Sequence, residues 1–217
     1  MIHAIVFDFD GVLADSEPLH LRAAQQVCAA IGVTIARDEY YARYLGYDDS
    51  GMFRAIGEAN GQQWDGRTIA ALVADKARVF DEAMLRGDVL YPGAVECVER
   101  MAAEFPLAIA SGALKHEIEA ILAGAGLAGR FRFIVASGDT AASKPAPDPY
   151  RRAAELHGLP PVQCLAIEDS RWGIESAKAA GLKCVGITHS YPAAALAAAD
   201  AVIESLESFT PAFVREL

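Results

Sequence analysis

The sequence predicts an α/β protein with a Rossmann-like, mostly parallel sheet core and an inserted α-helical cap domain. Two observations predict the core: short apolar runs recur along the chain, and segments with helical periodicity separate most of them. A third observation predicts the cap, because the pattern is helical throughout from Asp15 to about Arg86, with no convincing strand. The length of 217 residues favours one core with one smaller insert.

The first strand is expected at Ile2–Phe7, a continuous apolar run rich in Ile and Val that leads into Asp8. Such runs are typical of parallel strands that are covered on both faces. The same pattern predicts further strands at Pro106–Ala110, Phe131–Ala136, Gln163–Ile167, Lys183–Ile187 and Ala201–Ile203.

Helical periodicity predicts the segments that lie between most of these strands. They are Val95–Ala103, Glu117–Ala123, Pro149–Leu156 and Gly173–Ala180. Strands that alternate with helices form βαβ units, and ligands bind outside the carboxyl ends of their strands. The residues that follow each strand are therefore the first candidates for a functional site.

The expected cap carries its own helix signals. Ser16-Glu17-Pro18 is typical of a helix start, and Gly32 is typical of a helix end. Asp48-Asp49-Ser50 offers another start, and Ile69–Leu85 has the pattern of a long amphipathic helix.

The boundaries of the two domains follow from where this helical pattern begins and ends. Hinges are expected near Ala14–Glu17 and Gly87–Tyr91. The cap domain is thus predicted at residues 15–86, and the core domain at residues 1–14 and 87–217.

Composition excludes several classes of partner. A formal charge of −10 without a cluster of Lys and Arg disfavours nucleic acid and anionic membranes, since both require a basic surface. The sequence shows neither a secretion signal nor an apolar stretch of about 18 residues, so we expect a cytoplasmic protein. We also expect a monomer or a weak dimer. Four isolated cysteines without metal-ligand spacing are expected to be buried free thiols: Cys28, Cys97, Cys164 and Cys184.

Paired carboxylates follow the first expected strand. Asp8 and Asp10 lie two residues apart, which at strand spacing places both side chains on one side, and Gly11 lets the chain turn sharply. On its own this pattern is a weak signal, because acids at strand ends often belong to loops or helix caps.

A second pair of acids, Glu168 and Asp169, follows the apolar run that ends at Ile167. Carboxylates that share one crevice repel one another and raise each other's pKa unless a cation is present. A hard divalent ion with oxygen ligands, above all Mg²⁺, resolves this repulsion. The simpler alternative is that Asp169 caps the following helix, and one residue can do both.

Two further strand-end features could bind an anion. Ser111 and Gly112 combine a hydroxyl, a flexible backbone and a helix start, although a plain helix cap is the commoner use of such residues. Lys144 lies in a loop stiffened by three prolines, where its ammonium could neutralise a phosphate together with Asp8. A lone lysine is more often a solvated surface charge.

In this order the motifs resemble the haloacid dehalogenase superfamily, in its phosphatase and β-phosphoglucomutase-like branch with a helical cap. The strongest local matches are VFDFDGVLADSEPLH, SKPAPDPY and AIEDSRWGIESAKAAG. The resemblance implies that Asp8 attacks phosphorus to form an aspartyl-phosphate. Asp10 would donate a proton to the leaving oxygen and later activate water, which requires a pKa above the usual Asp value of about 3.9.

The resemblance also implies the ligands of the site. Mg²⁺ would be held by Asp8, the main-chain carbonyl of Asp10 and Asp169, with Glu168 as a ligand or a neighbour of the ligands. The phosphate and the rest of a small phosphorylated metabolite would be bound by Gly11, Ser111, Gly112, Lys144 and His20. In the mutase-like branch, the position of His20 helps couple cap closure to catalysis; a surface histidine is the alternative.

Other functions remain open at this point. The metal-free haloacid dehalogenase branch has no acid at the position of Asp10, so Asp10 argues against that function. A receiver-like signalling module is shorter, has no helical insert and places its acidic pair before its phosphorylated Asp, so it also fits less well. A β-phosphoglucomutase-like mutase needs a basic cap residue to grip a second phosphate. The loop Gly46–Gly51 is acidic instead, which favours hydrolysis, although Arg43, Arg54 or Lys76 could supply the charge.

Overall fold

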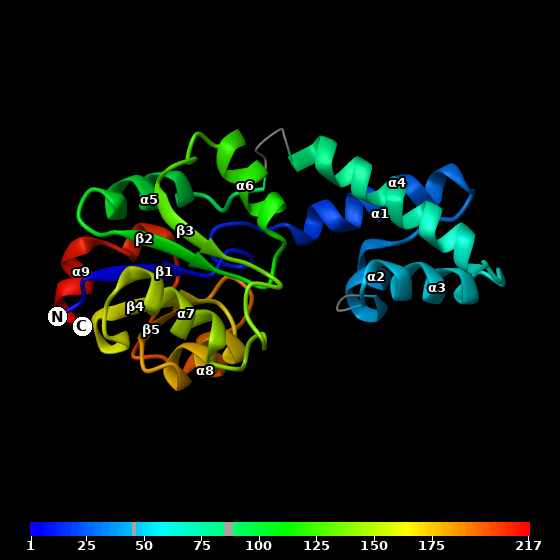
Figure 1. Cartoon of the computed structure of the whole chain (residues 1–217). Helices are drawn as coiled ribbons and strands as arrows, with labels where there is room; N and C mark the ends of the chain where they lie inside the picture. Colours follow the sequence, from blue (N-terminus) through cyan, green and yellow to red (C-terminus); the bar gives the residue numbers. More distant parts are fainter. Residues whose placement is uncertain (45–46, 85–88) are drawn as a thin grey trace. The chain divides into compact units, whose positions relative to one another are not determined.

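The computed structural model describes residues 1–44, 47–84 and 89–217. The chain divides into two compact units (Figure 1). The core unit comprises Met1–Ser16 and Val89–Leu217, and the inserted unit comprises Glu17–Asp88. The second boundary expected from the sequence, between residues 86 and 87, lies outside the described residues.

The core unit contains a parallel sheet, six-stranded within the described residues, in the order β3-β2-β1-β4-β5-β6. The predicted fold class, a parallel sheet core with a helical insertion, is therefore confirmed. The strands are β1 (Ala4–Phe7), β2 (Leu107–Ala110), β3 (Phe131–Val135), β4 (Cys164–Glu168), β5 (Lys183–Ile187) and β6 (Ala201–Ile203).

The strand expected at Gln163–Ile167 is wrong by one residue at each end. Pro161–Gln163 forms a short 3₁₀ helix, which removes Gln163 from the strand. At the other end Glu168 pairs with Gly186 in the ladder between β4 and β5. Glu168 is therefore the last residue of a central strand and not the first residue of a loop.

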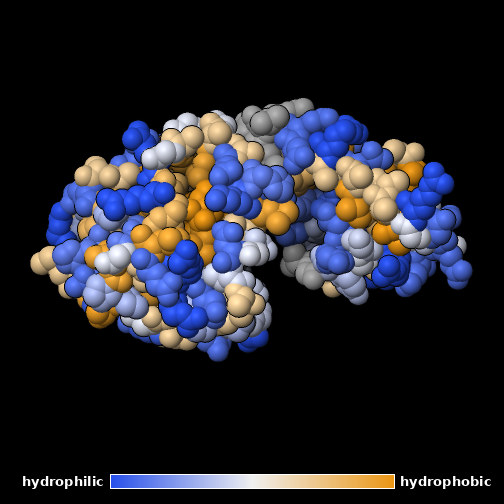
Figure 2. Space-filling view, viewed as in Figure 1, coloured by the Kyte–Doolittle hydropathy of each residue, from blue (hydrophilic) through white to orange (hydrophobic). Residues whose placement is uncertain are grey.

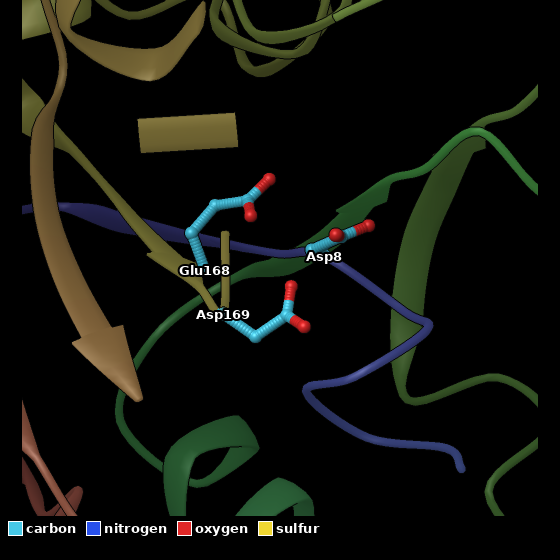
Figure 3. A group of neighbouring side chains, drawn as sticks. All are labelled: Asp8, Glu168 and Asp169. Carbon is cyan, nitrogen blue, oxygen red and sulfur yellow. The ribbon is translucent and has the colours of Figure 1, made fainter. Parts of the chain in front are cut away.

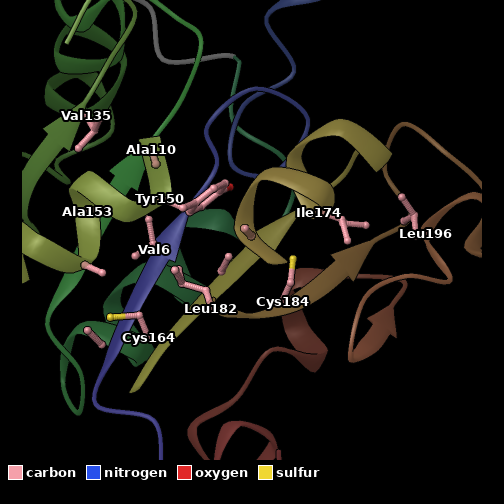
Figure 4. Close-up of a cluster of buried hydrophobic side chains, with 14 residues drawn as sticks. Val6, Ala110, Val135, Tyr150, Ala153, Cys164, Ile174, Leu182, Cys184 and Leu196 are labelled. Carbon is pink, nitrogen blue, oxygen red and sulfur yellow. The ribbon is translucent and has the colours of Figure 1, made fainter. Parts of the chain in front are cut away.

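Helices cover the sheet, as the alternating pattern predicts. They are α5 (Ala94–Ala102), α6 (Lys115–Gly124), α7 (Asp148–His157), α8 (Arg171–Ala179) and α9 (Pro211–Glu216). Beneath α7 and α8 lies a cluster of buried side chains that includes Val6, Tyr150 and Ile174 (Figure 4). Full burial of one large apolar side chain contributes about 1.5–3 kcal/mol, so this cluster fixes the helices on the sheet.

Phe7, which follows Val6 in β1, points to the opposite face of the sheet, because side chains alternate along a strand. The ring of Phe7 meets Phe131 at 6.0 Å and Phe209 at 5.9 Å between centroids, both edge to face. The central strand is therefore anchored on both faces, which holds its carboxyl end in a fixed position.

Within its described residues, the inserted unit is built of helices joined by short turns and irregular segments. It contains α1 (Glu17–Ala30), α2 (Arg37–Arg43), α3 (Asp49–Ala59) and α4 (Gly66–Met84). The Asp48 side chain caps α3 by accepting from the amide of Gly51 at 2.6 Å, and Gly32 follows α1 with φ of 77°. The segment Gly46–Gly51, expected as an acidic loop, is partly helical, because Asp49 to Gly51 belong to the first turn of α3; Gly46 lies outside the described residues.

The chain leaves the core unit and returns to it at neighbouring positions. Ala14 and Leu90 form an antiparallel bridge, and the amide of Tyr91 donates to the carbonyl of Leu13 at 2.9 Å. The outgoing and returning segments are therefore paired backbone to backbone.

The four cysteines are buried and free, as predicted. No helix within the described part of the chain is long and apolar enough to cross a bilayer. On the face shown in Figure 2, hydrophilic residues are spread over both units, with groups of apolar residues between them.

Candidate active site

The sheet register brings Asp8 and Glu168 together. β1 pairs with β4 so that Phe7 lies opposite Ile167, and the amide of Asp8 donates to the carbonyl of Ile167 at 3.0 Å. The residues that follow this pair therefore emerge side by side at the carboxyl edge. Asp8, Glu168 and Asp169 each present a carboxylate oxygen there, and the three oxygens lie within 4.8 Å of one another (Figure 3).

Lys144 reaches this cluster from the proline-rich loop before α7. Its Nζ lies 2.8 Å from Oδ1 of Asp8 and 2.6 Å from Oε1 of Glu168. The hydroxyl of Tyr150 donates to the same Glu168 oxygen at 2.7 Å, and the Tyr150 ring lies 5.1 Å from Nζ. The Lys144 side chain is only 14% exposed and is held by these contacts, which argues against the alternative of a solvated surface charge.

Burial and charge shift the pKa values of these groups. Burial raises the pKa of Asp8 well above 3.8, and the Glu168 carboxylate adds to the effect. Burial likewise raises the pKa of Asp169 to about 6. Burial alone would lower the pKa of Lys144, but Asp8 and Glu168 outweigh it and raise that pKa above its usual value. The lysine is therefore charged, while burial and neighbouring negative charge oppose the ionisation of Asp8 and Asp169.

The donor set of the cluster fits a hard divalent cation. All three side chains offer carboxylate oxygens, which are the preferred ligands of Mg²⁺ and Ca²⁺. Glu168 is already engaged, because Oε1 accepts from Lys144 and Tyr150 and Oε2 accepts from the Ser170 hydroxyl at 3.2 Å. Asp8 and Asp169 therefore have more carboxylate lone pairs available for a metal ion than Glu168 has.

The side chain of Asp10 lies outside this cluster. It accepts a hydrogen bond from the Ser16 hydroxyl at 2.7 Å. Burial raises the pKa of Asp10 above 3.8, the direction that a proton donor requires. Whether the main-chain carbonyl of Asp10 binds a metal stays a prediction.

Two glycines make room for the acids. Gly11 has φ of 79°, and a Cβ there would overlap the Asp169 carboxylate. A Cβ at Gly173, in the first turn of α8, would overlap the carboxylate of Glu168. Ordinary side chains at either position would displace an acid of the site.

Three of the five expected phosphate- and substrate-binding residues share one cavity of about 360 Å³, and Gly11 and His20 do not line it. Ser111, Gly112 and Lys144 line it together with the loop that follows β3, which includes Ser137 and Thr140. The Ser111 hydroxyl accepts from the amide of Ala113 at 3.2 Å, so it also caps the local turn.

His20 belongs to the inserted unit, where it contacts Lys76 and Phe80. Its Nδ1 lies 3.1 Å from Nζ of Lys76, and its ring stacks on Phe80 with centroids 4.2 Å apart. Lys76 is only 2% exposed and forms an ion pair with Asp49. Burial, followed by the Lys76 charge, lowers the pKa of His20 to about 4. Its role toward a substrate stays a prediction.

Sequence reasoning missed several polar partners of the site residues, of which three lie in the motifs named above. The hydroxyls of Tyr150 and Ser170 donate hydrogen bonds to the Glu168 carboxylate, and the Ser16 hydroxyl donates one to Asp10. Each lies within a motif singled out from the sequence, but a motif match does not say which of its hydroxyls face an acid.

The fold and this site define the chain as an α/β protein with a buried acidic cluster at the carboxyl ends of its central strands. The family model for haloacid dehalogenase-like hydrolases matches residues 2–181, and the chain belongs to that family. The resemblance identified from the sequence motifs is therefore confirmed.

Known relatives include phosphatases and a mutase-like protein. Fructose-1-phosphate phosphatase YqaB of Escherichia coli is 31% identical over 183 residues, covering 84% of this chain and 95% of the relative. CbbY of Rhodobacter sphaeroides, solved with xylulose-(1,5)bisphosphate, is 30% identical with a TM-score of 0.76 and covers 96% of both chains. A candidate β-phosphoglucomutase of Thermotoga maritima is 27% identical with a TM-score of 0.84 and covers 100% of both chains.

Proposed function

We propose that the chain is a Mg²⁺-dependent phosphatase that hydrolyses a small phosphomonoester, such as a sugar phosphate or a phosphoglycolate-like compound. The observation that carries this proposal is the placement of Lys144 between Asp8 and Glu168, beside the cluster of three acids. A nucleophilic carboxylate, a fixed cation and oxygen ligands for a metal are the parts that phosphoryl transfer through an aspartyl-phosphate requires.

In the first step a carboxylate oxygen of Asp8 bonds to phosphorus while the ester P–O bond breaks. Asp10 gives its proton to the departing oxygen, and its raised pKa supports this role. In the second step water attacks phosphorus, Asp10 accepts the proton of that water, and the bond to Asp8 breaks. The amide of Phe9 and Lys144 both bond Oδ1 of Asp8, at 2.7 and 2.8 Å, which fixes the nucleophile's orientation.

Asp8, Asp169 and the Asp10 carbonyl would hold Mg²⁺, which neutralises charge on the carboxylates and on the phosphoryl oxygens when it is bound. Glu168 is proposed as the partner of Lys144, because three donors already occupy its oxygens. Ser111, Gly112 and Lys144 would bind the phosphoryl group in the cavity that they line.

A mutase is the second candidate, since one relative is a candidate β-phosphoglucomutase. The ion pair between Lys76 and Asp49 supports hydrolysis instead. Lys76 is a candidate for gripping a second phosphate, but its charge is already matched by Asp49 within the inserted unit.

The four unpaired thiols support a cytoplasmic location.

The proposal is tested by measuring phosphate release from a panel of sugar monophosphates, a sugar bisphosphate and phosphoglycolate. We expect turnover with Mg²⁺, none in excess chelator, and a loss of many orders of magnitude in Asp8→Asn, which keeps the shape but removes the nucleophile. The same Asp8→Asn preparation controls for contaminating phosphatases. Turnover that survives in this variant or in the chelator would overturn the proposal.

A further inference from the structure

The turn that carries Asp10 is held by a side chain from a distant part of the chain. His189 lies just after β5, at the same edge of the sheet as the acids. Its Nδ1 lies 3.0 Å from the carbonyl oxygen of Gly11. Because a carbonyl oxygen only accepts, Nδ1 carries the proton of this hydrogen bond.

Tyr91 holds the imidazole in this orientation. The two rings stack with centroids 3.9 Å apart and an interplanar angle of 24°. Tyr91 is itself fixed by the bond from its amide to the carbonyl of Leu13 at 2.9 Å. The segment from Gly11 to Leu13 is therefore held at two points. The backbone amide of Tyr91 bonds the Leu13 carbonyl, and the imidazole of His189 bonds the Gly11 carbonyl.

The turn is built on a glycine. The Gly11 amide donates to the carbonyl of Ala14 at 2.8 Å, and His189 adds a bond to the Gly11 carbonyl. Gly11 has φ of 79° and no Cβ, so its local conformational preference does not restrain the turn. The Gly11 carbonyl belongs to the Gly11–Val12 peptide, which meets the peptide carrying the Asp10 carbonyl at the Cα of Gly11. A rotation of the Gly11–Val12 peptide therefore reaches Asp10 through the torsions of Gly11. A hydrogen bond to the Gly11 carbonyl opposes that rotation.

We propose that His189 is a positioning residue for Asp10 that acts through the carbonyl of Gly11, with Tyr91 fixing its ring. This inference rests on the proposed function in so far as it assigns Asp10 a role in proton transfer and metal binding. His189 itself contacts no reacting atom in this scheme.

The test compares His189→Ala and His189→Asn with a matched control, His157→Ala. Asn can place an amide N–H near the position of Nδ1, so it keeps the hydrogen bond that Ala removes. His157 is also packed on an aromatic ring, that of Phe133 at 4.6 Å, and its ring nitrogens have no hydrogen-bond partner among the described residues. It therefore controls for the loss of an imidazole from the same unit.

In His189→Ala we expect kcat to fall about 10–100-fold, the range for residues that orient site groups, with little change in KM. His189→Asn should recover most of that loss, and His157→Ala should keep the kcat of the parent chain. An unchanged kcat in His189→Ala overturns the proposal. So does an equal loss in His157→Ala, or an Asn variant that folds normally but is as slow as the Ala variant.

Calorimetric titration with Mg²⁺ provides a readout that does not depend on turnover. Displacement of the Asp10 carbonyl should weaken Mg²⁺ binding in His189→Ala but not in His157→Ala, and equal affinities would overturn the proposal. If the parent chain hydrolyses no phosphomonoester, the proposed function fails while this titration still decides the role of His189. If the parent is active and His189→Ala matches it in both measurements, only the positioning role fails.

Discussion

Nζ of Lys144 lies 2.8 Å from Oδ1 of Asp8, although one residue comes from a proline-rich loop and the other from the end of the central strand. The same ammonium contacts Glu168, and Asp169 completes the cluster. With all three acids ionised, one lysine leaves two negative charges unmatched. A single divalent cation would cancel this excess, which agrees with the all-oxygen donor set.

Removing the Lys144 charge should damage catalysis and stability together. In Lys144→Met we expect kcat to fall about 10²–10³-fold, because a fixed cation near the transferring phosphoryl group is lost. The melting temperature should also fall, since the buried Glu168 loses its counter-charge. Kinetics and thermal unfolding measure both effects. Lys178→Met, which removes the exposed pair with Asp200, is the control and should change little.

The stabilisation by Mg²⁺ should depend on pH. The pKa of Asp169 is raised to about 6 in the folded chain, so the metal-free fold binds more protons than the unfolded chain between about pH 4 and 6. Its stability therefore falls as pH rises through this window, and the raised pKa of Asp8 acts in the same direction. A bound cation replaces those protons.

We thus expect Mg²⁺ to raise the melting temperature by several degrees more at about pH 7.5 than at about pH 5.5. Differential scanning calorimetry with and without Mg²⁺ at each pH measures this difference. Equal shifts at the two pH values would show that these carboxyls do not bind the ion.

Gly173→Ala should disturb the site by displacing the side chain of Glu168. The new methyl group would overlap the carboxylate of Glu168, which cannot move away without breaking its bonds to Lys144 and Tyr150. We expect a loss of about 1–3 kcal/mol in unfolding free energy, together with reduced kcat. Gly66→Ala is the matched control, because Gly66 also lies at a helix start and none of the described atoms is within 4 Å of its Cβ position.

Hydrolysis should outpace isomerisation in a paired assay. With β-glucose 1-phosphate as substrate, inorganic phosphate and glucose 6-phosphate are followed together, without a bisphosphate activator. We expect phosphate release to dominate, because Lys76 is already paired with Asp49 and the second phosphate of a bisphosphate intermediate would lack that grip. A large excess of glucose 6-phosphate would favour the mutase and make Arg43 and Arg54 the next residues to substitute.

The parts of the site that the sequence could predict follow from strand ends. Apolar runs locate β1 and β4, and parallel pairing then brings Asp8 close to Glu168 and Asp169. The same rule did not decide whether Lys144 is solvated or buried, because the course of its loop depends on contacts far away in the sequence.

Side-chain partners chosen by tertiary packing could not be predicted. Lys76 lies in an amphipathic helix and looked like a cation available to a ligand, but the fold of the inserted unit buries it against His20 and Asp49. His189 gave no signal beyond its place after a strand, because its partner is a main-chain carbonyl, which every residue possesses.

The backbone bridge between Ala14 and Leu90 bears on how the inserted unit could change during evolution. Because the outgoing and returning segments are already paired, a short loop could close the gap between them without moving any strand. A different insert could therefore be accommodated between these two segments while the residues at the carboxyl edge of the sheet keep their places. Substrate preference and chemistry could then diversify separately, through recombination at one site on the surface of an unchanged sheet.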